Sequence, residues 1–283
     1  MATLPATTAR TPEHPLPWGK WGVRGLALTY LIGMLVIPLG VIVQDGLRGG
    51  LDGLWRQVTQ PVAWSALSLT LWTSAVMAVI NAVMGTVTAY VLVRYRFPGK
   101  AIINALVDIP FAIPTLVTGV MLVVLYGPQQ PLGKWVETTL GIRIIFAPPG
   151  IILALLFVTF PFVVRAIQPV LMSLDREQEE AAATLGAGAW TIFRRIVLPP
   201  LAGPLVSGTL LSFARAIGEF GAIVVVAGNI PLRSQTAAVF VFGEVESENR
   251  LGASAMSVVM LAIACGLVLA VDWLQRRRGG RPA

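Results

Sequence analysis

Six long apolar runs, separated by loops that carry charge, restrict this 283-residue chain more than any other feature. A helix that crosses the hydrocarbon core of a bilayer needs roughly 20 consecutive, mostly apolar residues. The six runs cover residues 25–43, 64–93, 104–126, 150–168, 203–227 and 252–274. Only 12% of the residues are charged, against about 25% in an ordinary soluble domain. The sequence therefore predicts an all-α polytopic membrane protein with six transmembrane helices.

The same runs predict the domain organisation. Residues 1–22, rich in proline, are expected to form a flexible cytoplasmic tail, and residues 23–60 the first span and an outer loop. The first run is longer than the apolar core of a cleaved signal peptide and contains Pro38, so we interpret it as an uncleaved span. Residues 61–275 would form the main membrane domain, followed by a basic tail at 276–283.

The lysines and arginines predict the orientation of the chain. With both termini on one side, fourteen of the 21 basic residues fall on that side: Arg10, Lys20, Arg24, Arg94, Arg96, Lys100, Arg165, Arg176, Arg194, Arg195, Arg276, Arg277, Arg278 and Arg281. The opposite loops hold six, namely Arg48, Arg56, Lys134, Arg143, Arg233 and Arg250. Because cytoplasmic loops carry the excess of basic residues, both termini are expected in the cytoplasm. The net charge of +7 thus reflects topology and does not indicate nucleic-acid binding.

Prolines interrupt the third and fourth runs. Pro110 and Pro114 lie near the start of the third run, and Pro161 lies inside the fourth. A proline removes a backbone donor and clashes with the preceding turn, so we expect these helices to be kinked or locally unwound. Broken backbone at membrane depth is tolerated where protein or a water-filled cavity covers it. The kinks therefore fit a bundle around a pathway, although each could also serve packing alone.

A charged segment, residues 175–199, lies between the fourth and fifth runs on the predicted cytoplasmic side. Acids come first (DREQEE) and alanines follow, an order that favours a helix. Gly186 and Gly188 permit a sharp turn, after which Ala189 to Arg195 can form a second short helix closed by Pro199 and Pro200. On periodicity alone, the segment could dock into a groove of a partner protein or lie along lipid headgroups.

The residue pattern of this segment resembles the EAA loop of ABC importer permeases. The family pattern is E-A-A-x3-G-x9-I-x-L-P, and its fixed positions are matched by Glu180, Ala181, Ala182, Gly186, Ile196, Leu198 and Pro199. The resemblance implies a type I importer permease of the MetI-like architecture, in which an EAA segment (residues 171–200) couples the chain to a separate ATP-binding subunit. Trp190, Phe193, Arg194 and Arg195 are expected to take part in that coupling as well.

No nucleotide site is expected in this chain itself. A phosphate-binding loop has the pattern G-x4-G-K-[ST]. The nearest stretch, GPQQPLGKW, has five residues between Gly127 and Gly133 and a tryptophan after the lysine. We therefore expect a non-catalytic subunit without cofactors, with ATP and Mg²⁺ bound by the partner ATPase. A single histidine, His14, gives no basis for a His-based metal site.

Four further stretches resemble the sulfate/thiosulfate importer permeases. They are LVRYRFPGK (92–100), LVDIPFAIPT (106–115), PFVVRAIQPVL (161–171) and FARAIGEFG (213–221), and VVVAGNIP (224–231) is similar to the CysT (or CysU) type of subunit. The resemblance implies sulfate import across the bacterial plasma membrane. The implied partners are two copies of an ATPase, a second, CysW-like permease subunit and an external sulfate-binding protein. Molybdate and tungstate permeases share the GEFG-like stretch and are the alternative.

Several polar residues within the runs are candidates for the substrate pathway. Arg215 and Glu219 are four residues apart and should share one helical face. An unpaired charge at the bilayer centre costs about 2.5–3.5 kcal/mol, so the two are expected to pair. They could form a purely structural ion pair, or Arg215 could help a divalent oxyanion through the gate. Asn81, Thr115 and Thr118 could line a cavity, although bonds between helices are the commoner use.

Asp108, beside Pro110, is expected near the cytoplasmic end of the third run. A carboxylate repels sulfate, so we assign a structural or gating role to Asp108, Pro110 and Pro114. Two other classes of protein compete with the importer. A secondary anion carrier would use an ion gradient and would need no docking segment. An intramembrane enzyme would need a nucleophile with a base, or metal ligands, at membrane depth, and the sequence has neither histidines nor clustered acids there.

Overall fold

A computed structural model describes residues 17–279 of the chain. The predicted tails therefore lie partly outside the described residues, at 1–16 and 280–283. Residues 17–22, predicted as the end of the N-terminal tail, already belong to the first helix. The chain divides into two compact units, residues 1–44 and 45–283, which are described separately.

The first unit is one apolar helical rod. It consists of α1 (Pro17–Leu31), a π-helical turn η1 (Ile32–Val36) and most of α2 (Ile37–Gly46). The stretch Trp21–Gly46 is long and apolar enough to cross a membrane. Its apolar side chains, such as Leu26 and Tyr30, are exposed within the unit, as expected of a helix that faces lipid. The π-helical turn directly precedes Pro38, whose missing N–H disturbs the regular ladder.

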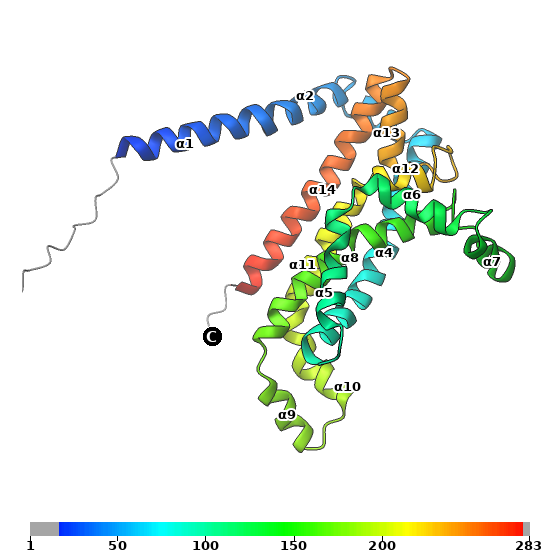
Figure 1. The fold of residues 1–283 in the computed structure, drawn as a ribbon. Coiled ribbons are helices and arrows are strands. Elements are labelled where there is room, and N and C mark those ends of the chain that lie inside the picture. Colours follow the sequence, from blue (N-terminus) through cyan, green and yellow to red (C-terminus); the bar gives the residue numbers. More distant parts are fainter. Residues whose placement is uncertain (1–16, 280–283) are drawn as a thin grey trace, which may run out of the picture. The chain divides into compact units, whose positions relative to one another are not determined.

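The second unit contains four further long helices that could cross a membrane (Figure 1). These are α4 (Pro61–Arg94), α8 (Pro148–Ser173), α11 (Leu198–Ile217) with the short elements before it, and α14 (Arg250–Gly279). A bent helix pair supplies the remaining span, so the described residues contain up to six. The predicted all-α fold with six spans is confirmed.

The third apolar run is broken into two helices. α5 (Lys100–Ala112) and α6 (Thr115–Tyr126) meet at an angle of 112° at Ile113 and Pro114. Pro114 immediately precedes α6. Its missing N–H costs no hydrogen bond there, because N–H groups at the start of a helix have no acceptor within that helix. Pro110 lies inside α5 and Pro161 inside α8 without ending either helix. The predicted break is therefore present in the third run, and it is located at Pro114.

The fifth apolar run differs from the predicted span 203–227. The helix starts earlier, because α10 (Ala189–Ile192) continues through the π-helical turn η2 (Phe193–Val197) into α11. Pro199 and Pro200 do not close a helix, contrary to the prediction. The amide of Leu198 bonds to the carbonyl of Phe193, and this wider turn accommodates the prolines that follow. The helix then ends at Ile217, and a separate short helix, α12 (Gly221–Val226), follows.

Three short helices in the loops between the spans were not predicted: α3 (Gly50–Val58), α7 (Pro131–Leu140) and α13 (Ala237–Glu246). The loop between α12 and α13 is unusual because it is polar and yet buried at Ser234, Gln235 and Thr236. Ser234 donates to the carbonyl of Ala227 at 2.6 Å, which ties the loop back onto α12. α12 and α13 lie at the end of the second unit opposite α9 and α10, whereas α7 projects from its side (Figure 1).

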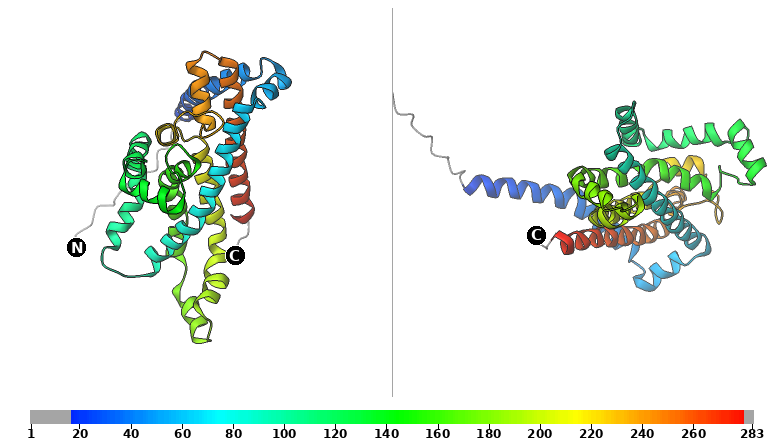
Figure 2. Two further views of the ribbon diagram at one scale, coloured as in Figure 1. Left: turned by 90° about the vertical axis from the view of Figure 1, so that its right-hand side faces the viewer. Right: turned by 90° about the horizontal axis from the view of Figure 1, so that it is seen from below.

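The centre of the second unit is α8, which packs against α4 and α11 (Figure 2). Met77 of α4, Leu155 of α8 and Ala216 of α11 belong to the same fully buried cluster. Asn81 of α4 donates to the hydroxyl of Thr159 of α8 at 2.9 Å inside this core. In contrast, many apolar side chains of α4, α5 and α6 are exposed, as expected for surfaces that face lipid or another membrane subunit.

Candidate functional site

The EAA segment forms a helix–turn–helix at one end of the second unit (Figure 1). Its first helix, α9 (Arg176–Thr184), begins at Asp175, whose carboxylate accepts the amide N–H of Glu177 at 3.0 Å. Gly186 then adopts φ of +85°, a conformation that residues with a Cβ rarely take. Gly188 has an ordinary φ of −71° and precedes α10. The predicted acidic start and the reversal at Gly186 are confirmed.

The tip of the EAA segment projects away from the bundle (Figure 2). Leu185 is 89% exposed and Trp190 is 71% exposed, although both are large and apolar. Of the other predicted coupling residues, Glu180, Ala181, Gly186, Arg194, Arg195 and Pro199 are exposed, whereas Ala182, Phe193, Ile196 and Leu198 are half-buried. An exposed apolar tip with flanking charges is typical of a docking surface for another protein.

The base of the EAA segment is fixed to α4 by an ion pair that the sequence analysis missed. The guanidinium of Arg94, the last residue of α4, pairs with the carboxylate of Glu179 in α9. Both side chains are well buried. The adjacent acid, Glu180, points outward and is exposed. The sequence places Arg94 and Glu179 85 positions apart, so no local pattern could reveal the pair.

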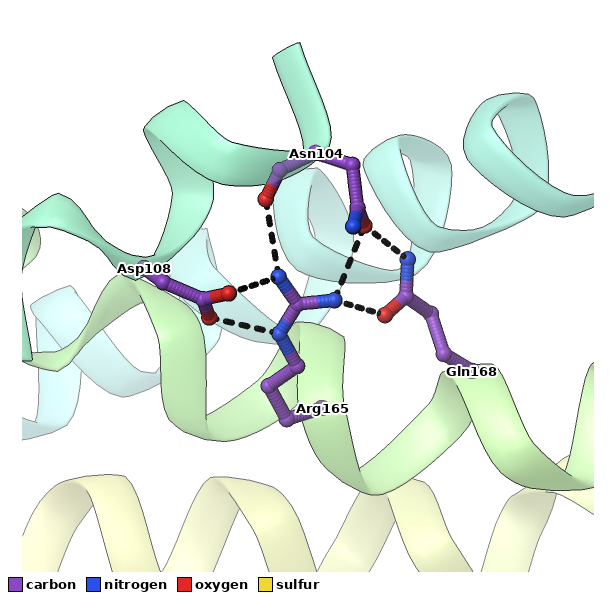
Figure 3. A network of polar contacts seen from close by, with 4 residues as sticks. All are labelled: Asn104, Asp108, Arg165 and Gln168. Atoms are coloured by element: carbon purple, nitrogen blue, oxygen red, sulfur yellow. Dashed lines mark hydrogen bonds and ion pairs between the residues drawn. The ribbon is translucent and has the colours of Figure 1, made fainter. Parts of the chain in front are cut away.

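Arg165 of α8 is the centre of a polar network with α5 (Figure 3). Its Nε donates to Asp108 Oδ1 at 2.7 Å, and its Nη2 donates to Asp108 Oδ2 at 2.5 Å and to the carbonyl of Asn104 at 2.8 Å. Its Nη1 donates to Asn104 Oδ1 at 2.9 Å and to Gln168 Oε1. All five N–H groups of the guanidinium are therefore used. Arg165 thus belongs to the bundle, although the orientation count assigned it to a loop.

Arg215 and Glu219 form the predicted ion pair, with 2.9 Å between Nη2 and Oε2. Glu219 lies beyond the end of α11, in the break before α12, so the two do not share one helix as predicted. The Glu219 side chain is 1% exposed and also accepts the amide N–H of Ala222 at 3.0 Å. The Arg215 side chain is 38% exposed and has no other polar partner among the described residues. The guanidinium of Arg215 therefore keeps N–H groups that can donate to a further acceptor.

The breaks in the third and fifth runs lie against each other. An added Cβ on Gly119 of α6 would stand 2.7 Å from the carbonyl oxygen of Ala222 in α12. A Cβ on Gly221 would overlap the hydroxyl of Thr115. Glycine at these two positions lets the backbones of α6 and α12 approach closely, as small residues do between membrane helices. Thr115 is therefore close to the break that holds Glu219.

The remaining candidates occupy different environments. Asn81 is 1% exposed and bonds Thr159 of α8, and Thr118 is equally buried beside Gly119. In this structure both lie inside helix packing and not on an open surface. Pro110 lines an apolar groove between α5, α6 and α8, together with Leu106, Met121 and Phe157.

A membrane helix bundle with a broken span and an exposed EAA segment is the arrangement expected of an ABC transporter permease, and the sequence matches place the chain in that class of protein. The chain belongs to the family described as "Binding-protein-dependent transport system inner membrane component", whose family model matches residues 81–280. The resemblance noted in the sequence is thereby confirmed.

Within this family, the chain is similar to proteins named as sulfate permeases. It is 42% identical over 250 residues to the "Probable sulfate transport system permease protein cysT" of Nephroselmis olivacea, a match that covers 88% of each chain. It is 38% identical over 257 residues to the "Sulfate transport system permease protein CysT" of Escherichia coli (strain K12), which covers 91% of this chain and 92% of that one.

Solved structures share the fold at low sequence identity. A chain of a bacterial alginate ABC transporter, crystallised with an alginate-bound periplasmic protein, matches with a TM-score of 0.76 at 15% identity over 94% of this chain and 96% of that chain. A chain of the MetNI methionine ABC transporter matches with a TM-score of 0.52 at 18% identity over 77% of this chain and 98% of that chain. The predicted type I, MetI-like architecture is confirmed.

Proposed function

We propose that this chain is the membrane-spanning permease subunit of an ABC importer that moves sulfate, and also thiosulfate, into the cytoplasm. The observation that carries the proposal is similarity over 88–91% of the chain, at 38–42% identity, to permeases named for sulfate transport. The stretches that resemble this subfamily include residues 161–171 and 213–221, which contain Arg165 and Arg215. The substrate assignment therefore rests on stretches of the membrane core, whereas the EAA segment supports the ABC class alone.

The EAA segment supports a separate ATPase as partner. Its exposed tip carries Leu185 and Trp190 beside the acid Glu180 and the bases Arg194 and Arg195. Such a surface suits a groove of a protein better than lipid headgroups, because its charges are of both signs. We propose that two copies of the ATPase, a second, CysW-like permease and an external sulfate-binding protein complete the importer.

Hydrolysis of ATP is assigned to the ATPase subunits, with ATP and Mg²⁺ bound there. The sequence of this chain contains no phosphate-binding loop, which supports a non-catalytic role. The excess of basic residues on one side supports an orientation with both termini in the cytoplasm. The membrane that we propose is the bacterial plasma membrane. In this orientation the EAA segment faces the compartment that contains ATP.

Arg215 is the residue that we assign to the anion pathway. Arg165 has no free N–H, whereas Arg215 is partly exposed and, among the residues that the structure describes, pairs with Glu219 alone. Glu219 is fixed by the amide of Ala222, so it orients Arg215 without moving far itself. Thr115, another predicted pathway residue, lies at the facing break beside Gly221. Asp108, Pro110 and Pro114 are assigned to the architecture of the broken span.

In the proposed cycle, ATP-driven closure of the ATPase dimer displaces the EAA segments of both permease subunits. Because the EAA segment is continuous with α8 and α11, its displacement tilts these helices and opens the cavity to the outside. The sulfate delivered by the binding protein then enters the cavity, and the release of phosphate returns the bundle to the inward-facing state.

Uptake by the purified, reconstituted complex tests this proposal. Vesicles with the four kinds of subunit should accumulate labelled sulfate only when ATP is present on the ATPase side. Excess thiosulfate should compete, and molybdate or tungstate should compete weakly. Strong competition by molybdate with poor sulfate uptake would reassign the substrate. Uptake that continues without ATP under a proton gradient would instead indicate a secondary carrier.

A further inference from the structure

The EAA segment is linked to the bundle at three helices, but only two of these links are covalent. Residues 174–175 join α9 to α8, and η2 joins α10 to α11. The third link is to α4, which is distant in sequence and reaches the segment through side chains alone. α4 has 34 residues and is therefore about 50 Å long, longer than the roughly 30 Å hydrocarbon core. Its last turns thus extend beyond the core toward the EAA segment.

The link to α4 is a buried ion pair supported by hydrogen bonds. The side chains of Arg94 and Glu179 are only 7% and 16% exposed. Arg176, at the start of α9, donates to the carbonyl of Arg94 at 2.7 Å, and Arg94 itself donates to the carbonyl of Leu174 at 3.4 Å. The first of these bonds satisfies a carbonyl that a helix end leaves without an intrahelical partner. The end of α4 is therefore tied to both sides of the α9 start.

An aromatic contact makes a second connection between the same two parts. Phe193, in η2, meets the ring of Tyr90 of α4 edge-to-face, with 5.8 Å between ring centroids. On its other side Phe193 stacks on Trp190, at 5.7 Å and an interplanar angle of 24°. Trp190 is largely exposed at the tip. A continuous aromatic path thus leads from the predicted docking surface to α4.

The ion pair, its hydrogen bonds and the aromatic contact form a joint between α4 and the EAA segment. Together these contacts resist separation of the two parts. Removing one partner of a buried ion pair leaves an uncompensated charge, so the pair separates less easily than an exposed one. The aromatic contact and the buried Leu92, Leu171 and Val197 around it exclude water from the same region. A displacement of the EAA segment should therefore carry the end of α4 with it.

Further along α4 toward its start, the helix is hydrogen-bonded to the remainder of the bundle at two points. Asn81 bonds Thr159 of α8, and Thr70 accepts the amide N–H of Ala237, at the start of α13, at 2.8 Å. A shift at Arg94 would therefore reach the core and the buried loop between α12 and α13. Without the joint, α4 would follow the EAA segment only through lateral packing against α8 and α11.

We propose that Arg94 and Glu179 are positioning residues that transmit the motion of the EAA segment to α4. The inference rests on the proposed function, because it assumes that an ATPase drives that segment. The pair touches neither ATP nor the transported anion. Its role is to make α4 move together with α8 and α11 as one lever, so that each hydrolysed ATP is converted into opening of the cavity.

The test is the ratio of sulfate imported to ATP hydrolysed, measured on one preparation of the reconstituted complex. Coupling free energies between sites typically correspond to about 5–150-fold, so Glu179→Gln should lower this ratio at least about fivefold while ATP hydrolysis continues. The charge-swapped double variant, Arg94→Glu with Glu179→Arg, should recover most of it. Glu177→Gln is the matched control, because this exposed acid on the same helix forms no ion pair with any described residue.

An unchanged ratio in Glu179→Gln would overturn the proposal, as would a double variant as uncoupled as the single one. If Glu179→Gln prevents assembly, the double variant decides: a coupled complex supports the joint, and failure to assemble or to couple contradicts it. A smaller yield with an unchanged ratio would show a structural role alone and would also overturn it. Failure of the wild-type complex to import sulfate would instead contradict the proposed function. The ratio of imported anion to hydrolysed ATP would then be measured with the oxyanion that the wild-type complex imports.

Discussion

Arg165 and Asp108 form a two-bond fork between α8 and α5, with 2.7 Å from Nε to Oδ1 and 2.5 Å from Nη2 to Oδ2. This fork fixes α5, the first half of the broken span, to the central helix. The second half, α6, is instead in close backbone contact with α12 through Gly119. The two sides of the 112° bend at Pro114 therefore have different main contacts, although α6 also packs against α8.

Asp108→Asn should weaken this fork and destabilise the protein. The loss removes a charge-assisted bond, and because Asp108 is half exposed we expect about 1 kcal/mol of unfolding free energy. Thermal unfolding of the purified complex measures it, with Glu177→Gln as control. A changed KM for sulfate at unchanged stability would contradict the structural assignment.

Arg215→Gln should impair transport and leave assembly intact. The change removes charge-assisted hydrogen bonds to the anion, and a loss of about 1.5–3 kcal/mol corresponds to about tenfold or more in the uptake rate. The measurement is initial sulfate uptake per assembled complex. Arg143→Gln, at an exposed arginine of the predicted outer loop, is the control and should transport normally. Unchanged uptake kinetics in Arg215→Lys and Arg215→Gln would remove Arg215 from the pathway.

Glu180→Lys should uncouple the importer through the docking surface. Reversing an exposed charge that faces the proposed ATPase replaces an attraction with a repulsion, so ATP-dependent uptake should fall while the chain still folds. Copurification of the ATPase and uptake are measured together. Glu137→Lys, on α7 at the side of the second unit, is the matched reversal. Normal assembly and uptake in Glu180→Lys would exclude this residue from the contact.

Gly221→Ala should disturb the contact between the two breaks. The new Cβ would overlap the Thr115 hydroxyl and stand 3.1 Å from the amide nitrogen of Leu116. Since the latter is backbone, Thr115→Ala should rescue the variant only in part. Gly266→Ala, where the added Cβ meets nothing, should be tolerated. Yield and thermal stability of the membrane-extracted protein are the readouts, and a fully stable Gly221→Ala would show that the break can open without loss.

Gly186→Ala and Gly188→Ala should differ although the residues are two positions apart. Gly186 has φ of +85°, and forcing a residue with a Cβ into this region costs about 1–2 kcal/mol. Gly188 has φ of −71°, which alanine adopts without strain. We therefore expect only Gly186→Ala to lower the melting temperature or the ATPase binding of the complex. Equal effects of the two substitutions would contradict the assignment of the turn to Gly186.

The sequence was sufficient to predict most of the spans, the all-α class, the position of the EAA segment and the family. These properties depend on local signals: apolar length, the acidic start at Asp175, the glycine turn at Gly186 and a motif of fixed spacing. The break at Pro114 was also predictable, since proline acts on its own turn. Such features need no knowledge of what lies beside them.

The contacts across the bundle, in contrast, are known only from the folded structure. Arg94 pairs with Glu179, and Arg165 pairs with Asp108. The break after α11 separates Glu219 from the helix that contains Arg215, its partner. The continuation of the fifth helix through Pro199 also depended on the wider turn at η2. A sequence shows that charged residues in apolar helices need partners, but many partners satisfy that requirement equally well. The packing of α4, α5, α8 and α11 selects one set, because only packed helices fix the distances between side chains far apart in the chain.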